Sequence, residues 1–137
     1  MAFPTVMVNL WHVLAAVVVM QVIGHVWYGP LFQKTWMKLA SVKKMDCSGG
    51  KMVGIMVSSV VMSAISVYIL AHFVSYAGAS SFADVASLTG WLWLGFMVPI
   101  QLGKVLWEGK SVKLLILNAG YDIVALTAAA YTLVSLA

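Results

Sequence analysis

Four long apolar stretches, separated by short polar connections, set the hydrophobic pattern of this chain. They cover about 8–28, 53–76, 86–106 and 114–136. The hydrocarbon core of a bilayer is about 30 Å thick, and roughly 20 apolar residues in a helix cross it. Because each stretch is that long, the pattern predicts an all-α fold, an integral membrane bundle of four transmembrane helices. We expect residues 1–137 to form this single transmembrane domain.

Lysine is confined to two of the connections. All eight lysines lie between residues 34 and 51 or between residues 104 and 113, and the chain has no arginine. Cationic loops resist translocation and stay in the cytoplasm. We therefore expect loops 29–52 and 104–113 to be cytoplasmic and both termini to be extracytoplasmic, which agrees with an even number of spans. Lysines at membrane ends predict contact with anionic lipid headgroups, so the net charge of +4 is not interpreted as nucleic-acid binding.

The connection after the first span contains a short amphipathic segment. Its apolar and cationic residues lie on different sides of a helix: Phe32, Trp36 and Leu39 against Lys34 and Lys38. This spacing predicts a short helix in the cytoplasmic membrane interface. Pro30 can begin that helix, because the first turn of a helix needs no N–H group from it.

Three single residues carry further local predictions. Asp84 lies in the short connection before the third span, where its carboxylate is expected to cap the helix. Pro99 lies inside the third apolar stretch and predicts a kink there. Cys47 is the only cysteine, so an intrachain disulfide and a CxxC metal site are both excluded.

Polar side chains at membrane depth carry most of the chemical information, because an Asp near the middle of a span costs about 2.5–3.5 kcal/mol on insertion scales. Asp122 is expected about 13 Å from the lysine-bearing end of the fourth helix. Gln21 and Gln101 are expected at the same depth, and His25 near Asn118, one turn closer to the cytoplasm. Two alternatives stay open for Asp122. It is either ionised opposite a protonated His25, or neutral and hydrogen-bonded to Gln21 or Gln101.

The candidates for binding a ligand, an ion or a proton surround this polar layer: Gln21, His25, Tyr28, Gln101, Asn118, Tyr121 and Asp122. A stripe of small residues on the second helix is interpreted as a packing surface: Ser59, Ser63 and Ser66. No metal site is predicted, because His12 and His72 have no carboxylate or thiol nearby. The sequence contains no catalytic motif and names no cofactor.

Three functional classes stay open. We favour binding or transport of a small solute or ion through the polar layer. The first alternative is an accessory or scaffold subunit of a membrane complex, whose polar groups only hold helices together. The second is an intramembrane enzyme, with its candidate residues in the cytoplasmic half: His25, Tyr28, Glu108, Tyr121 and Asp122. A bundle of 137 residues has little interior to spare, so we expect a homo-oligomer, with a dimer as the default.

Three segments carry a family resemblance: WYGPLFQKTWM, WLGFM and LWEGKSVKLLILNAGYDIV. Their most specific parts are a W-Y-x-P-L-F motif with Trp27, Tyr28 and Pro30, and an E-G-K motif followed by N-A-G-Y, with Glu108, Gly109, Lys110, Asn118 and Tyr121. Across essentially the whole chain they resemble the domain of unknown function 1761 family of small bacterial membrane proteins. The resemblance implies four transmembrane helices in a bacterial inner membrane and no known activity.

The lysine pattern places all of these motifs at the cytoplasmic face. The segment WYGPLFQKTW is also similar to the Trp-Tyr segment of the tryptophan-rich sensory protein family. That family binds porphyrins and sterols in a five-span bundle, so an apolar ligand stays open as well.

Overall fold

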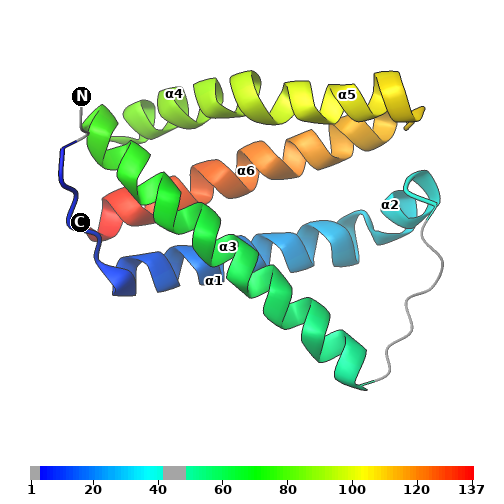
Figure 1. Cartoon of the computed structure of the whole chain (residues 1–137), viewed down its shortest axis with the longest axis horizontal. Coiled ribbons are helices and arrows are strands. Elements are labelled where there is room, and N and C mark those ends of the chain that lie inside the picture. The colour runs from blue at the N-terminus through cyan, green and yellow to red at the C-terminus, as the bar shows by residue number, and fades with distance from the viewer. Residues whose placement is uncertain (1–3, 42–48) are drawn as a thin grey trace.

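The computed structural model describes residues 4–41 and 49–137 of the chain (Figure 1). In this part of the chain every regular element is a helix. Four helices are long and apolar enough to cross a membrane: Leu10–Leu31, Gly49–Ala77, Phe82–Glu108 and Val112–Leu136. The prediction of an all-α membrane protein with four candidate spans is therefore confirmed. Cys47 lies outside the described residues, within the first lysine-bearing loop.

The elements in chain order are α1 (Leu10–Val26), the π-helical turn η1 (Trp27–Leu31), α2 (Gln33–Leu39), α3 (Gly49–Ala77), α4 (Phe82–Leu92), the π-helical turn η2 (Trp93–Met97), α5 (Val98–Glu108) and α6 (Val112–Leu136). The first span consists of α1 and η1, and the third consists of α4, η2 and α5. A π-helical turn holds about one residue more than an α-helical turn, so it changes the direction of all later side chains.

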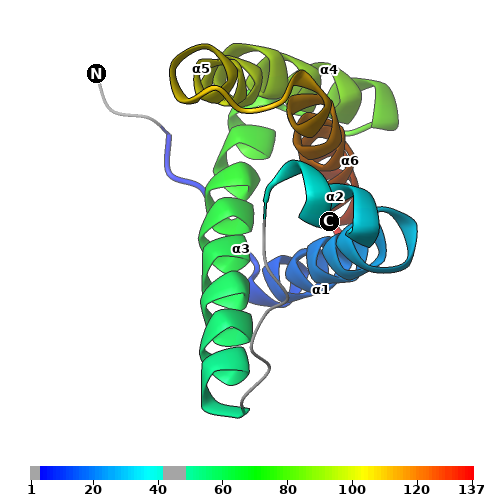
Figure 2. The ribbon, with the colours of Figure 1, turned by 90° about the vertical axis from the view of Figure 1, so that its right-hand side faces the viewer.

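The α6 helix lies at the centre of the bundle, between α1 and the continuous α4–α5 span, and it contacts α1, α3, α4 and α5 (Figure 1). The α3 helix crosses the others obliquely, and its first half leads away from α4 and α5 (Figures 1 and 2). Short and branched apolar side chains fill the crossings: Val13, Ala16 and Val17 of α1, Val67, Leu70 and Val74 of α3, and Ala125, Ala129 and Ala130 of α6. Small side chains let helices approach closely inside a membrane, which accounts for the central place of the alanine-rich α6.

The start of α4 is fixed by a capping box. The N-cap residue is Ser81, whose Oγ accepts a hydrogen bond from the Asp84 backbone N–H at 3.2 Å. The Asp84 carboxylate accepts hydrogen bonds from the backbone N–H groups of Ser80 and Ser81, both at 3.0 Å. Asp84 thus contributes to the cap as predicted, but as the third residue of the helix and together with Ser81.

The two prolines within the spans lie in or close to π-helical turns. Pro30 lies inside η1, so it does not begin the short helix α2, for which Phe32 is the N-cap residue. Pro99 is at the start of α5, directly after η2. Proline has no N–H group to donate, so in a regular α-helix the carbonyl one turn before it would lack its hydrogen bond. A wider turn beside the proline avoids this unsatisfied carbonyl.

Candidate functional site

The membrane-depth carboxylate of Asp122 is bonded to α5. Gln101 Nε2 donates a hydrogen bond to Asp122 Oδ2 at 3.3 Å, and both side chains are half-buried. Asp122 lies ten residues into α6, which places it about 15 Å from the start of the helix and near the middle of the span. Among the described residues, Asp122 forms no ion pair with any lysine or histidine.

His25 does not approach this carboxylate. Its side chain is exposed, and its ring Nδ1 lies 2.8 Å from the backbone oxygen of Gln21, one turn earlier on the same helix. Of the two alternatives for Asp122, the structure therefore gives the hydrogen bond from Gln101 and not the pairing with His25.

Gln21 is directed toward α3 and not toward Asp122. Its Nε2 donates hydrogen bonds to Ser63 Oγ at 2.8 Å and to Ser59 Oγ at 3.2 Å. The expected layer of Gln21, Gln101 and Asp122 is therefore divided into two separate contacts, one between α1 and α3 and one between α5 and α6.

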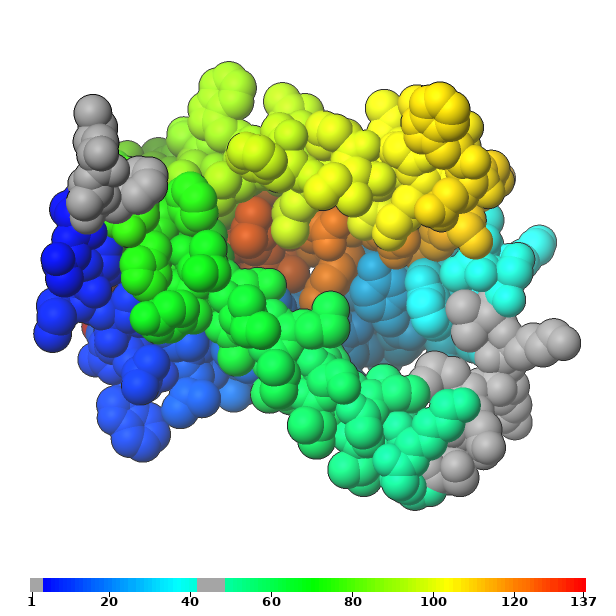
Figure 3. All heavy atoms as spheres, in the orientation of Figure 1, coloured from blue at the N-terminus to red at the C-terminus, as the bar shows by residue number. Residues whose placement is uncertain are grey.

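A cavity of about 760 Å³ lies beside Asp122, between α3, η2, α6 and Met20 of α1. We call it the α3–α6 groove. Its lining includes Asp122, Tyr121 and four serines of α3, with methionines and aliphatic residues: Met20, Lys51, Gly54, Ile55, Ser58, Ser59, Met62, Ser63, Ser66, Met97, Tyr121, Asp122, Ala125 and Leu126. Figure 3 shows the hollow, with α6 (orange) at its floor between α3 (green) and α5 (yellow).

The groove includes Ser59, Ser63 and Ser66, which we interpret from the sequence as a packing surface. Ser59 and Ser63 do hold α1 through Gln21, as that interpretation requires. Ser58 and Ser66 lie beside them on the groove wall. The spacing of the serines along α3 is the sequence feature that marks this wall of the groove. It does not reveal that the first half of α3 leads away from α5.

A second cluster joins Tyr28, Asn118 and Tyr121 at the junction of η1 and α6. The Tyr28 hydroxyl donates a hydrogen bond to Asn118 Oδ1 at 2.8 Å, and the rings of Tyr28 and Tyr121 have centroids 5.2 Å apart. Trp27 Nε1 donates to the backbone oxygen of Leu117 at 3.2 Å. These residues of both sequence motifs thus fasten the end of the first span onto α6, and Tyr121 connects this cluster to the groove.

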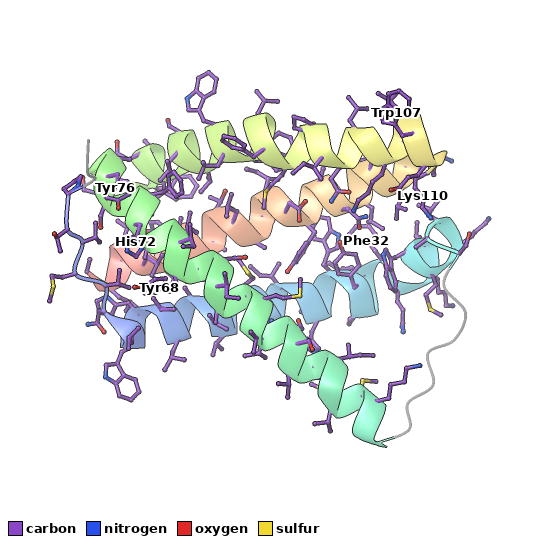
Figure 4. All side chains as sticks on the ribbon, in the orientation of Figure 1. Phe32, Tyr68, His72, Tyr76, Trp107 and Lys110 are labelled. Atoms are coloured by element: carbon purple, nitrogen blue, oxygen red, sulfur yellow. The ribbon has the colours of Figure 1, made fainter. Side chains whose placement is uncertain are left out.

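The E-G-K motif forms the turn between α5 and α6. Gly109 ends α5 with φ of 67°, a left-handed conformation that glycine adopts without strain. The backbone N–H of Lys110 donates to the oxygen of Lys104 at 3.2 Å, and the side chains of Glu108 and Lys110 are exposed. In Figure 4, Lys110 lies at this turn and Trp107 points away from the bundle. These motif residues shape the turn and do not line the groove.

Comparison with known proteins identifies one family. Residues 11–134 match the family model described as Protein of unknown function (DUF1761). A search of curated proteins finds no match to this chain, and neither does a search of solved structures.

Proposed function

This chain belongs to the DUF1761 family of proteins of unknown function, and we propose that it binds a small solute or ion in the α3–α6 groove as the binding step of transport. Asp122 is the residue that holds the solute. The observation that carries the proposal is a carboxyl group at mid-membrane that lines a cavity and has no ion pair among the described residues.

The energy balance at Asp122 supports a role beyond helix packing. A hydrogen bond between polar side chains inside a membrane contributes about 0.6–2 kcal/mol. An Asp near the middle of a span costs about 2.5–3.5 kcal/mol. The single 3.3 Å bond from Gln101 does not offset that cost, so structure alone gives no reason to keep a carboxyl group here.

The groove is open near the start of α3 and closed toward the other end. Its lining begins at Lys51 and includes Ser66, about 22 Å further along α3. Beyond it, Leu70, Val74 and Leu133 are buried in the core, and Val74 and Leu133 also line a separate cavity of about 580 Å³. Transport would therefore require α3 to move relative to α6, and the oblique crossing of α3 leaves its first half free of α5 (Figure 2).

We propose the following membrane setting for the groove. Loops 29–52 and 104–113 are cytoplasmic, beside anionic lipid headgroups, and both termini are extracytoplasmic in a bacterial inner membrane. The α2 helix lies in the cytoplasmic interface, with Trp36 as its anchor. In this orientation the groove opens to the cytoplasm. The chain acts as a homodimer, the simplest closed assembly for so small a bundle.

The test compares Asp122→Asn with Glu108→Gln, a matched control that replaces an exposed carboxylate by its amide. Each full-length variant is extracted into lipid nanodiscs, and retained small molecules are identified by native mass spectrometry. We expect the wild type and Glu108→Gln to retain the same solute and Asp122→Asn to lose it, with equal helix content in all three. A solute that Asp122→Asn retains equally would contradict the role of the carboxylate. A wild-type chain that retains none would favour the accessory-subunit alternative.

A further inference from the structure

We infer that the solute is a monovalent organic cation with an apolar body, and that it competes with a proton for Asp122. This inference rests on the proposed function of the α3–α6 groove and names its substrate class.

The size of the groove indicates an organic molecule and not an inorganic ion. One water molecule takes up about 30 Å³ of liquid volume, and binding sites for drug-sized molecules are about 300–1,000 Å³. The groove of about 760 Å³ lies well inside the second range. An ion of atomic size in this space would touch one wall only and would leave Asp122 or the serine hydroxyls of α3 without a contact.

The charge of the groove indicates a single positive charge. Among the described residues, Asp122 is the one acidic residue that lines it. Lys51 also lines the groove and the charge of Lys104 acts on Asp122 from α5, but neither lysine forms an ion pair with this carboxylate. An unpaired carboxylate in a membrane is strongly unfavourable, and a cation beside it removes most of that cost. A dication would leave one positive charge uncompensated in the same apolar surroundings, which makes a monovalent cation the better match.

The walls of the groove fit an apolar body of variable shape. Met20, Met62 and Met97 contribute flexible, polarisable side chains, which adapt to different ligands. Tyr121 also lines the groove next to Asp122 in the sequence, and an aromatic ring attracts a cation. Beside these, Ser58 and Ser66 supply hydroxyl groups on the α3 wall. One carboxylate, one aromatic ring and apolar walls are the features by which a substituted ammonium ion is recognised.

Competition with a proton follows from the single carboxylate. Asp122 is neutralised either by a proton or by the cation, so cation entry releases the proton to water, and a proton displaces the cation. Other ionisable groups that interact with Asp122 are Tyr121 on its own helix, Tyr28 on η1 and Lys104 on α5, and Lys51 on α3 lines the same groove. The charge of Lys104 acts on Asp122, but among the described residues neither lysine forms an ion pair with it, and the proposed cation would make that contact.

The experiment uses dicyclohexylcarbodiimide, which adds to protonated carboxyl groups in apolar surroundings. The full-length protein in lipid nanodiscs is treated at several pH values, and the adduct at Asp122 is quantified by peptide mass spectrometry. Benzyltrimethylammonium, its neutral carbon isostere neopentylbenzene, and Na⁺ are compared as protecting agents. We expect benzyltrimethylammonium at about ten times its Kd to slow modification of Asp122 about tenfold. We expect neopentylbenzene and Na⁺ to have no effect. The concentration that gives half-protection should rise as the pH falls, by up to about tenfold per pH unit.

A pair of variants tests whether the cation occupies the groove. Ser58→Phe adds a ring to the groove wall, and Val57→Phe adds the same ring to the neighbouring exposed position, which does not line the groove. Among the described residues, the Ser58 hydroxyl bonds to Gly54 of its own helix and to no other helix, so the change removes no hydrogen bond between the described helices. We expect Ser58→Phe to raise the half-protection concentration about tenfold or more and Val57→Phe to leave it unchanged.

Each other outcome overturns the inference in a defined way. Protection by Na⁺ as strong as that by benzyltrimethylammonium would assign an inorganic ion and would leave the proposed function intact. Equal protection by neopentylbenzene would show that charge is not recognised. Modification of Asp122 that nothing prevents would exclude organic cations, while the retained-solute experiment decides the proposed function separately. An Asp122 that never reacts would refute proton competition.

Discussion

Gly120 on α6 offers the sharpest test of how the first span is fastened to the centre of the bundle. A Cβ atom added there would lie 3.2 Å from Trp27 Cζ2 and 3.5 Å from Trp27 Cη2. Carbon atoms in contact are ordinarily about 3.5–4.0 Å apart, so the indole must move by a few tenths of an ångström. The movement is resisted because Trp27 Nε1 donates to the oxygen of Leu117, and because the indole packs against Phe32 with centroids 4.9 Å apart.

The magnitude follows from two opposing effects of Gly120→Ala. Overpacking against a fixed side chain costs about 1–3 kcal/mol. Alanine also favours the helix over glycine by up to about 1 kcal/mol. Gly90→Ala on α4 is the matched control, since nothing lies within 4 Å of a Cβ atom at Gly90 and only the second effect applies. Helix propensity cancels between the variants, so Gly120→Ala should be about 1–3 kcal/mol less stable than Gly90→Ala.

The free energy of unfolding is measured by titrating each variant in mixed micelles with dodecyl sulfate and following far-ultraviolet circular dichroism. The same pair of substitutions is then made in a Trp27→Phe background, where the smaller ring leaves room above Gly120. We expect the difference between the two alanine variants to shrink to a few tenths of a kcal/mol in that background. Equal stability of Gly120→Ala and Gly90→Ala in the Trp27 protein would refute the proposed close packing of the indole on α6.

The four spans could be predicted because their length and apolar character are local properties of the sequence. The end of the first span was harder to predict. The apolar span extends to Leu31, but Gly29 inside η1 has non-helical dihedral angles, with φ and ψ both −106°, so the helix is kinked directly before Pro30. A hydrophobic pattern does not distinguish a π-helical turn from the start of a new helix.

The direction of each polar side chain could not be predicted from the sequence. Gln101 follows η2, and one additional residue in a turn rotates every later side chain by about 100°. That rotation helps to decide whether Gln101 meets Asp122, as it does at 3.3 Å, or faces lipid. Spacing along an assumed regular α-helix therefore leaves the pairing open.

The direction of His25 was available from the sequence in part. The buried face of α1 is formed by Val13, Ala16, Val17 and Met20, and Gly24 continues it one turn later against Tyr121. His25 is one residue beyond Gly24, about 100° away from that face, and is exposed. Small residues at helical spacing thus mark the face that packs in a membrane better than polar residues do.

Two further predictions address the second cluster and the orientation of the chain. Tyr28→Phe removes the 2.8 Å hydrogen bond to Asn118 and should lower the free energy of unfolding by about 0.6–2 kcal/mol. Adding Asn118→Ala to this variant should cause no further loss, because both changes remove the same bond. If the two losses add in full, the bond is not a shared interaction. For the orientation, Cys47→Ser removes the only native thiol, and Lys110→Cys or Ala77→Cys then adds one at an exposed end of α5–α6 or of α3. Lysine-bearing loops are retained in the cytoplasm, so a membrane-impermeant maleimide applied to intact cells should label Ala77→Cys. Lys110→Cys should stay unlabelled until the inner face of the membrane is exposed. The reverse pattern would invert the proposed topology and place the mouth of the groove outside the cell.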